Sequence, residues 1–138
     1  MVALLRLKGR VHETEARFLR AHTKRKIKFT LPGPMTIVDT VADRFYGDRA
    51  KLAMAFAELL NQEALALQAD GVDIVQFDEP AFNVYMDEVN TWGIADLERA
   101  AQGLPTFQSK VVVSLAGITA SRTGASVHEE AAEYKVDA

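Results

Sequence analysis

The pattern of hydrophobic and polar positions predicts helices and strands that alternate along the chain. A partly apolar helical face indicates a first helix from about His12 to His22, and the alternation from Ile27 to Leu31 has the period of a strand. Apolar residues at helical spacing then run from Met35 to Phe45. The longest predicted helix extends from about Arg49 to Ala69, and Gly71 is placed to end it in a left-handed conformation.

The second half of the chain continues this alternation. The nearly continuous apolar run from Val72 to Phe77 is typical of a parallel strand that helices cover. We expect Thr91 to act as the N-cap of a helix from Ile94 to Gln102, which closes at Gly103. A third strand is predicted from Val111 to Leu115. This order favours right-handed βαβ units and a parallel sheet, so the predicted fold class is α/β.

Composition narrows the class of protein without identifying it. The 138 residues are 49% hydrophobic and 25% charged, which is typical of a globular domain with a sizeable core. The net charge of −3 gives no overall footprint for nucleic acid or an anionic membrane. No apolar run is as long as a membrane span, and the start of the chain shows no signal-peptide pattern. The absence of cysteine excludes disulfides and thiolate catalysis within this chain, and it fits a cytoplasmic location.

The candidate site is the strand end Gln76–Pro80. Parallel α/β folds bind ligands at the carboxyl ends of their strands. Alternation places Gln76 and Asp78 on the face opposite the helices, so that Asp78 points at a ligand while Glu79 points away or into the loop. A carboxylate there could bind a substrate ammonium, act as a base or ligate a metal. Acidic residues before proline also solvate strand ends, and position alone does not decide between these roles.

Three segments, in their order and spacing, resemble the cobalamin-independent methionine synthase family. They are the turn segment Phe29–Thr36, the helical segment Arg49–Asp73 with its Asn61-Gln62-Glu63 sequence, and the strand end Val75–Ala81 with its Asp-Glu-Pro motif. The earlier segment Arg17–Thr23 is similar to the lead-in of the short, single-barrel members. The resemblance extends from about Val11 to Leu104, and it is specific in combination.

The resemblance implies a TIM-barrel enzyme that transfers a methyl group from a methylated folate to the thiol of homocysteine. In this family a zinc ion binds the thiol and favours the reactive thiolate. The aspartate of the motif contacts the amino group of homocysteine, a role that falls on Asp78. Glu79 is carried over only as a residue beside the site. Gln76 is a further candidate for substrate binding, because a polar side chain in a buried strand implies a polar layer there. The implied partners are small molecules, with neither nucleic acid nor membrane among them.

The chain departs from the family where zinc should bind. The resemblance places a His and a Cys on the strand predicted at Val111–Leu115, and neither is there. The three histidines are His12, His22 and His128. The last of these lies beside Glu129 and Glu130, where a solvated helix face is a better interpretation than a metal site. We therefore assign no metal ligand to this chain.

Length also departs from a full TIM barrel, which needs roughly 250 residues. We interpret residues 1–110 as a methionine-synthase-like barrel segment, about half of a barrel. Residues 111–138 form a last strand and a divergent tail, for which a non-native or disordered state is one interpretation and a short helix from Ser126 to Ala138 is another. Our hypothesis is a truncated gene product whose exposed strand edges drive homo-oligomer formation.

Two other functions remain open from the sequence. One is an inactive or oligomerising barrel fragment, and the other is a metal-free lyase resembling uroporphyrinogen decarboxylase. The basic cluster Lys24–Lys28 could bind the acidic tail of a polyglutamylated folate. We favour a solvated position for this cluster, because it precedes a strand and so belongs to the end opposite the active site.

Overall fold

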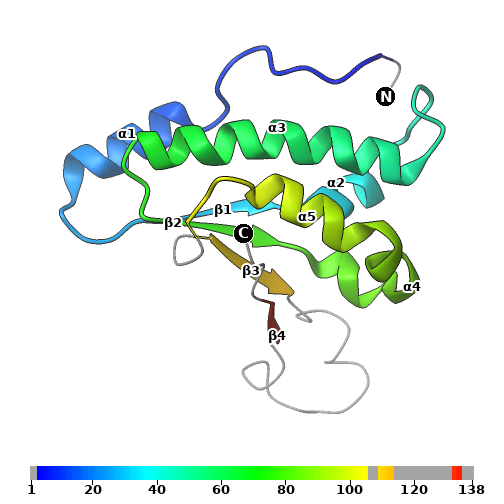
Figure 1. Cartoon of the computed structure of the whole chain (residues 1–138). Helices are drawn as coiled ribbons and strands as arrows, with labels where there is room; N and C mark the ends of the chain where they lie inside the picture. Colours follow the sequence, from blue (N-terminus) through cyan, green and yellow to red (C-terminus); the bar gives the residue numbers. More distant parts are fainter. Residues whose placement is uncertain (1–2, 106–108, 114–131, 135–138) are drawn as a thin grey trace.

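The computed structural model describes residues 3–105, 109–113 and 132–134, and Figure 1 shows how their elements are arranged. In chain order these elements are α1 (Glu13–His22), β1 (Lys28–Pro32), α2 (Pro34–Thr40), α3 (Arg49–Ala69), β2 (Ile74–Asp78), the 3-10 turn η1 (Pro80–Asn83), α4 (Met86–Glu88), the π-helical turn η2 (Val89–Gly93), α5 (Ile94–Ala101), β3 (Ser109–Val113) and β4 (Ala132–Tyr134).

The sheet has the order β1-β2-β3-β4. β1 pairs in parallel with β2, with Leu31 opposite Phe77, and β2 pairs in parallel with β3. β4 pairs with β3 in the antiparallel direction. The predicted α/β class and parallel strand order are therefore confirmed, with an antiparallel edge strand in addition. The fraction of a barrel that this sheet represents stays a prediction.

The core lies between one face of the sheet and the long helix α3, with α5 packed beside it (Figure 1). Phe77 and Leu31 from the strands, Leu67 from α3 and Leu97 from α5 are all buried in one cluster. Burial of such side chains is the main stabilising term of the fold. The helices α1 and α3 begin and end within one residue of the predicted bounds. Gly71 has the expected positive φ of 93° after α3, and Gly103 has a φ of 79° after α5.

The helix predicted from Met35 to Phe45 is too long, because α2 ends at Thr40 and Val41 is extended. The Asp43 carboxylate accepts hydrogen bonds from the backbone N–H groups of Phe45, Tyr46 and Gly47. Local side-chain bonds of this kind compete with the helical ladder. The periodic apolar residues beyond Thr40 therefore belong to a turn.

The prediction of an N-cap at Thr91 is wrong. Thr91 lies inside η2, and its hydroxyl donates to the carbonyl of Asp87. Helical backbone runs from α4 through η2 into α5, so α5 needs no separate cap at its start.

The third strand begins two residues before its predicted start, at Ser109, and its last two predicted residues lie outside the described part of the chain. Ala132–Tyr134 form β4, so the interpretation of Ser126–Ala138 as a short helix is wrong for these three residues. The rest of that segment lies outside the described residues. Pairing with β3 gives these residues hydrogen bonds to a neighbouring strand, whereas a short isolated helix is only marginally stable. In the part of the chain that the structure describes, none of the helices is long and apolar enough to cross a membrane.

Candidate functional site

A row of three hydrogen-bonded side chains lies on the sheet face opposite the helices. Lys28 Nζ on β1 donates to Gln76 Oε1 at 2.8 Å, and Gln76 Nε2 on β2 donates to Asp78 Oδ1 at 2.7 Å. We call this set the Lys28–Gln76–Asp78 row. Burial along β2 alternates, since Val75 and Phe77 are buried while Gln76 and Asp78 are half-buried. The sequence-based assignment of Gln76 and Asp78 to one face is therefore confirmed.

Asp78 ends β2 beside the end of β1. The backbone N–H of Gly33 donates to the Asp78 carbonyl at 2.7 Å, which joins the two strand ends. Among the described residues, Asp78 Oδ2 has no hydrogen-bond partner, whereas Oδ1 is held by Gln76. Asp78 therefore offers one oriented carboxylate oxygen at the carboxyl end of a parallel strand, the position where ligands bind in such folds.

Glu79 points the other way, into the helix side of the sheet. Its side chain is fully buried, and it accepts hydrogen bonds from Met35 N at 3.2 Å and from Thr36 N at 2.6 Å. The Thr36 hydroxyl also donates to it, at 2.5 Å. The expectation that Glu79 points away from the ligand side agrees with this geometry. A substrate-binding role for Glu79 stays a prediction.

Glu79 fits this place because residue 33 is a glycine. A Cβ added to Gly33 would lie 2.1 Å from Glu79 Oε2, far inside van der Waals contact. The backbone of the Pro-Gly-Pro turn, at the end of β1, thus lies close against the carboxylate of Glu79, which follows β2. Burial raises the pKa of Glu79, and the hydrogen bonds from Thr36 and Met35 oppose this effect.

Asp96 is a second buried acid, on α5. It is 1% exposed, and burial, with the nearby charge of Glu79, raises its pKa to about 7. Its Oδ2 atom has no hydrogen-bond partner in the structure as described. Sequence reasoning missed Asp96, although its position four residues before Ala100 places it on the buried stripe of the helix.

Sequence reasoning also missed the role of Lys28. The basic cluster belongs to the amino end of β1, but the flexible side chain of Lys28 reaches along the sheet to Gln76. Lys28 pairs with Ile74 in the strand register, and Gln76 is the next residue on the same face. Side chains in this diagonal relation lie within reach of a long side chain. Lys28 therefore belongs to the row, whereas Lys24 and Lys26 are exposed before the strand.

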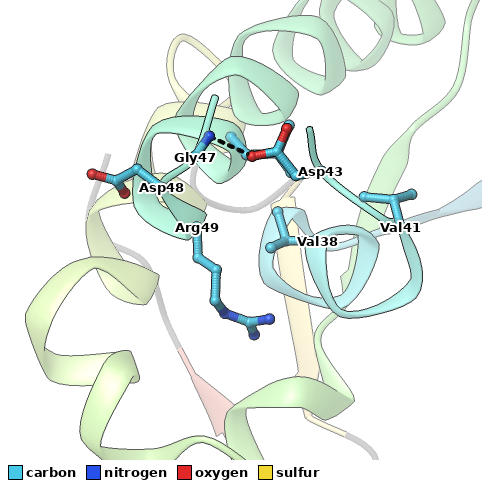
Figure 2. A pocket seen from close by; sticks show the side chains of 7 residues that line it. Val38, Val41, Asp43, Gly47, Asp48 and Arg49 are labelled. Atoms are coloured by element: carbon cyan, nitrogen blue, oxygen red, sulfur yellow. Dashed lines mark hydrogen bonds between the residues drawn. The ribbon is translucent and has the colours of Figure 1, made fainter. Parts of the chain in front are cut away.

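A pocket of about 370 Å³ lies apart from the row, between the end of α2 and the start of α3 (Figure 2). It is lined by Val38, Val41, Asp43, Gly47, Asp48, Arg49 and Leu52. Its charged groups already have partners within the chain: Asp43 holds its turn, Asp48 caps α3, and Arg49 lies over the Tyr85 ring and bonds to Glu88. This pocket is a hollow between structural contacts, and we do not assign the site to it.

The described residues do not fit the zinc site that the family resemblance implies. Among them, no group of three His, Asp or Glu side chains could hold a metal ion, and the whole sequence has no cysteine. His12 packs against Phe29, and His22 stacks on Phe18. His128 lies outside the described residues. We derive no step of the chemistry through zinc bound to this chain.

The fold and the row define an α/β protein with a half-buried carboxylate, Asp78, at the carboxyl end of a parallel strand. Residues 6–110 match the family model described as the catalytic domain of cobalamin-independent synthase. The chain belongs to this family.

Individual relatives agree with this assignment. The chain is 34% identical over 90 residues to a methionine synthase of Thermoplasma volcanium, covering 60% of this chain and 26% of that protein. It is 33% identical over 91 residues to the methionine synthase of Thermococcus kodakarensis, covering 65% and 27%. A solved B12-independent methionine synthase from Shewanella sp. W3-18-1, in complex with selenomethionine, shares 54% identity and a TM-score of 0.72. That match covers 77% of this chain and 30% of the Shewanella chain, so the chain spans less than a third of each of these relatives.

Proposed function

We propose that this chain carries the amino-acid-binding part of a cobalamin-independent methionine synthase, an enzyme that methylates the thiol of homocysteine. The observation that carries the proposal is the Asp78 carboxylate at the end of β2, with one oxygen oriented by Gln76 and the other without a hydrogen-bond partner among the described residues. The 54% identity with a structure that contains selenomethionine supports an amino acid of this shape as the ligand.

In the proposed reaction, the homocysteine thiol loses its proton and its sulfur bonds to the methyl carbon as the bond from that carbon to the folate nitrogen breaks. The electron pair of the broken bond stays on the nitrogen, which takes up a proton, so the products are methionine and the demethylated folate. Asp78 acts at the other end of homocysteine, where its carboxylate accepts hydrogen bonds from the ammonium group. A charge-assisted bond of this kind fixes both position and orientation. Fixing the amino-acid end keeps the sulfur in line with the methyl group, which lowers the entropic part of the barrier.

We assign no thiol activation to this chain. In the family a zinc ion binds the sulfur and stabilises the thiolate. The sequence has no cysteine, and the described residues contain no group of side chains that could bind a metal ion. The role that we propose for these side chains is therefore recognition of the amino acid. The site of the methylated folate and the cytoplasmic location stay predictions.

The proposal is tested by titrating L-methionine, the product, into the purified chain and following its NMR signals. Asp78→Asn should weaken binding at least about tenfold, since a hydrogen bond to a charged group is lost. The deaminated analogue 4-(methylthio)butanoate should bind wild type and variant alike, because it has no ammonium group. The affinity for methylated folate should change less than the affinity for L-methionine or homocysteine.

The matched control is Asp87→Asn, which removes an exposed carboxylate on α4. It should leave the affinity for L-methionine unchanged. Equal losses for L-methionine and its deaminated analogue in Asp78→Asn, or no loss at all, would contradict the role of Asp78.

The two alternatives have weaker support. The family match over residues 6–110 favours methyl transfer over a lyase resembling uroporphyrinogen decarboxylase. A fragment that has lost the amino-acid site would bind neither L-methionine nor homocysteine, so the same titration tests whether this site is intact.

A further inference from the structure

Chemistry fixes the direction of the Lys28–Gln76–Asp78 row. A lysine ammonium only donates hydrogen bonds and a carboxylate only accepts them, whereas the end of a glutamine side chain has one accepting and one donating group. Gln76 between Lys28 and Asp78 can therefore satisfy both neighbours in one orientation alone. Its oxygen faces Lys28 at 2.8 Å, and its nitrogen faces Asp78 at 2.7 Å.

This direction has a consequence for the Asp78 carboxylate. Because Gln76 Nε2 occupies Oδ1, the carboxylate cannot turn freely about its bond to the rest of the side chain. Its Oδ2 then also keeps one orientation, and it has no hydrogen-bond partner among the described residues. A ligand ammonium meets an acceptor that is already oriented, so less conformational entropy is lost on binding.

Lys28 supplies the anchor of the row at its far end. Among the described residues, the side chain of Gln76 is held across the strand pair β1–β2 through Lys28, while its other hydrogen bond goes to Asp78 on its own strand. Without the Lys28 ammonium group, the Gln76 side chain regains its rotamer freedom. Water then competes with the Gln76 amide for the Asp78 carboxylate.

We propose that Lys28 is a positioning residue, which through Gln76 holds Asp78 in the orientation that accepts the ammonium group of the amino-acid substrate. The inference rests on the proposed function in that Asp78 is the ammonium acceptor. Lys28 itself does not contact the ligand.

The test combines the side-chain NH₂ signals of Gln76 in NMR with the titration of L-methionine. In Lys28→Met, the two Gln76 signals should move toward those of a freely rotating glutamine. The affinity for L-methionine should fall by about threefold to tenfold, which corresponds to the loss of one ordinary hydrogen bond. The affinity for 4-(methylthio)butanoate should stay the same.

Two further variants make the test specific. Lys26→Met removes an equal charge from an exposed position two residues before Lys28, and it should change neither the Gln76 signals nor the affinity. Lys28→Arg restores a cationic donor and should recover most of the affinity. Because Lys28 is exposed, these substitutions leave the core intact.

Three results would overturn the inference or the function beneath it, each in a different way. Unchanged Gln76 signals in Lys28→Met would show that Lys28 does not orient the amide. Equal losses for L-methionine and its deaminated analogue would mean that Lys28 binds the ligand carboxylate directly. If Asp78→Asn binds L-methionine as wild type does, the proposed function and the ligand part of the inference fail, while altered Gln76 signals in Lys28→Met would still confirm the orienting contact.

Discussion

At the scale of single residues, the pair Gly33 and Glu79 shows how closely the two strand ends are fitted. Glu79 is fully buried against the first residues of α2, and Gly33 leaves the space that its carboxylate fills. The φ of Gly33 is −75°, which any residue adopts. The requirement for glycine is therefore steric rather than conformational.

Gly33→Ala should destabilise the chain by about 1–3 kcal/mol, because the new methyl group overlaps the Glu79 carboxylate. In a Glu79→Ala background the overlap is gone, and the same substitution should become neutral or slightly stabilising through the unfolded state. Urea unfolding of the four proteins gives this double-mutant cycle. Additive effects in the cycle would contradict the steric explanation.

At the scale of elements, α3 holds the N-terminal segment through two acids. Glu63 is 3% exposed and accepts hydrogen bonds from Arg10 Nε and from the backbone N–H of His12. Asp70, at the end of the helix, pairs with Arg10 and Arg17. Figure 1 shows the N-terminal segment running beside α3 before it enters α1. Glu63 thus anchors the residue before α1 and substitutes for a side-chain cap, which that helix lacks.

Glu63→Gln should lower the free energy of unfolding at pH 7 by about 1–3 kcal/mol, because a charged hydrogen-bond acceptor is lost at a buried position. Burial raises the pKa of Glu63, but the bonds from Arg10, His12 and Val11 outweigh it and leave the pKa lowered. The stability that the Glu63 carboxylate contributes is present above its pKa in the unfolded state, and it is lost as pH falls through its lower pKa in the folded state.

The difference between wild type and Glu63→Gln in denaturant unfolding should therefore shrink as pH falls below the ordinary glutamate pKa and disappear below the lowered pKa of the folded state. Glu58→Gln, at an exposed position of the same helix, is the matched control and should have no such effect. A difference that persists unchanged in acid would contradict an electrostatic origin.

At the scale of the whole molecule, β1 forms one edge of the described sheet, and β4 forms the other. Ile27 accepts from β2 and Gly33 donates to β2, so strand alternation turns the backbone N–H of Thr30 to the free edge. Unpaired edges of this kind associate with other strands.

We therefore expect concentration-dependent association of the purified chain, measured by sedimentation velocity. Thr30→Pro removes the edge donor and should weaken association, since proline blocks strand pairing on that side. The matched control is Thr30→Ser, which keeps the backbone N–H and should associate as wild type does. Association unchanged in Thr30→Pro would place the contact elsewhere.

The sequence by itself determined the elements whose signals are local. The 3.6-residue period of α3, the glycine after it and the apolar run of β2 depend only on neighbouring residues. The predicted bounds of α3 agree with the structure, whereas β2 begins two residues after and ends one residue after the predicted run Val72–Phe77. Alternation along β2 also separated Asp78 from Glu79 correctly, because the pleat has a period of two.

Tertiary structure decided what depends on partners distant in sequence. The early end of α2 depends on hydrogen bonds that the side chain of Asp43 makes in a turn, and the space for Glu79 depends on Gly33, which lies 46 residues earlier. The row that orients Asp78 forms because parallel pairing brings Lys28 beside β2, across 48 residues of chain. Period and propensity carry no information about such contacts, since chain folding alone brings these residues together.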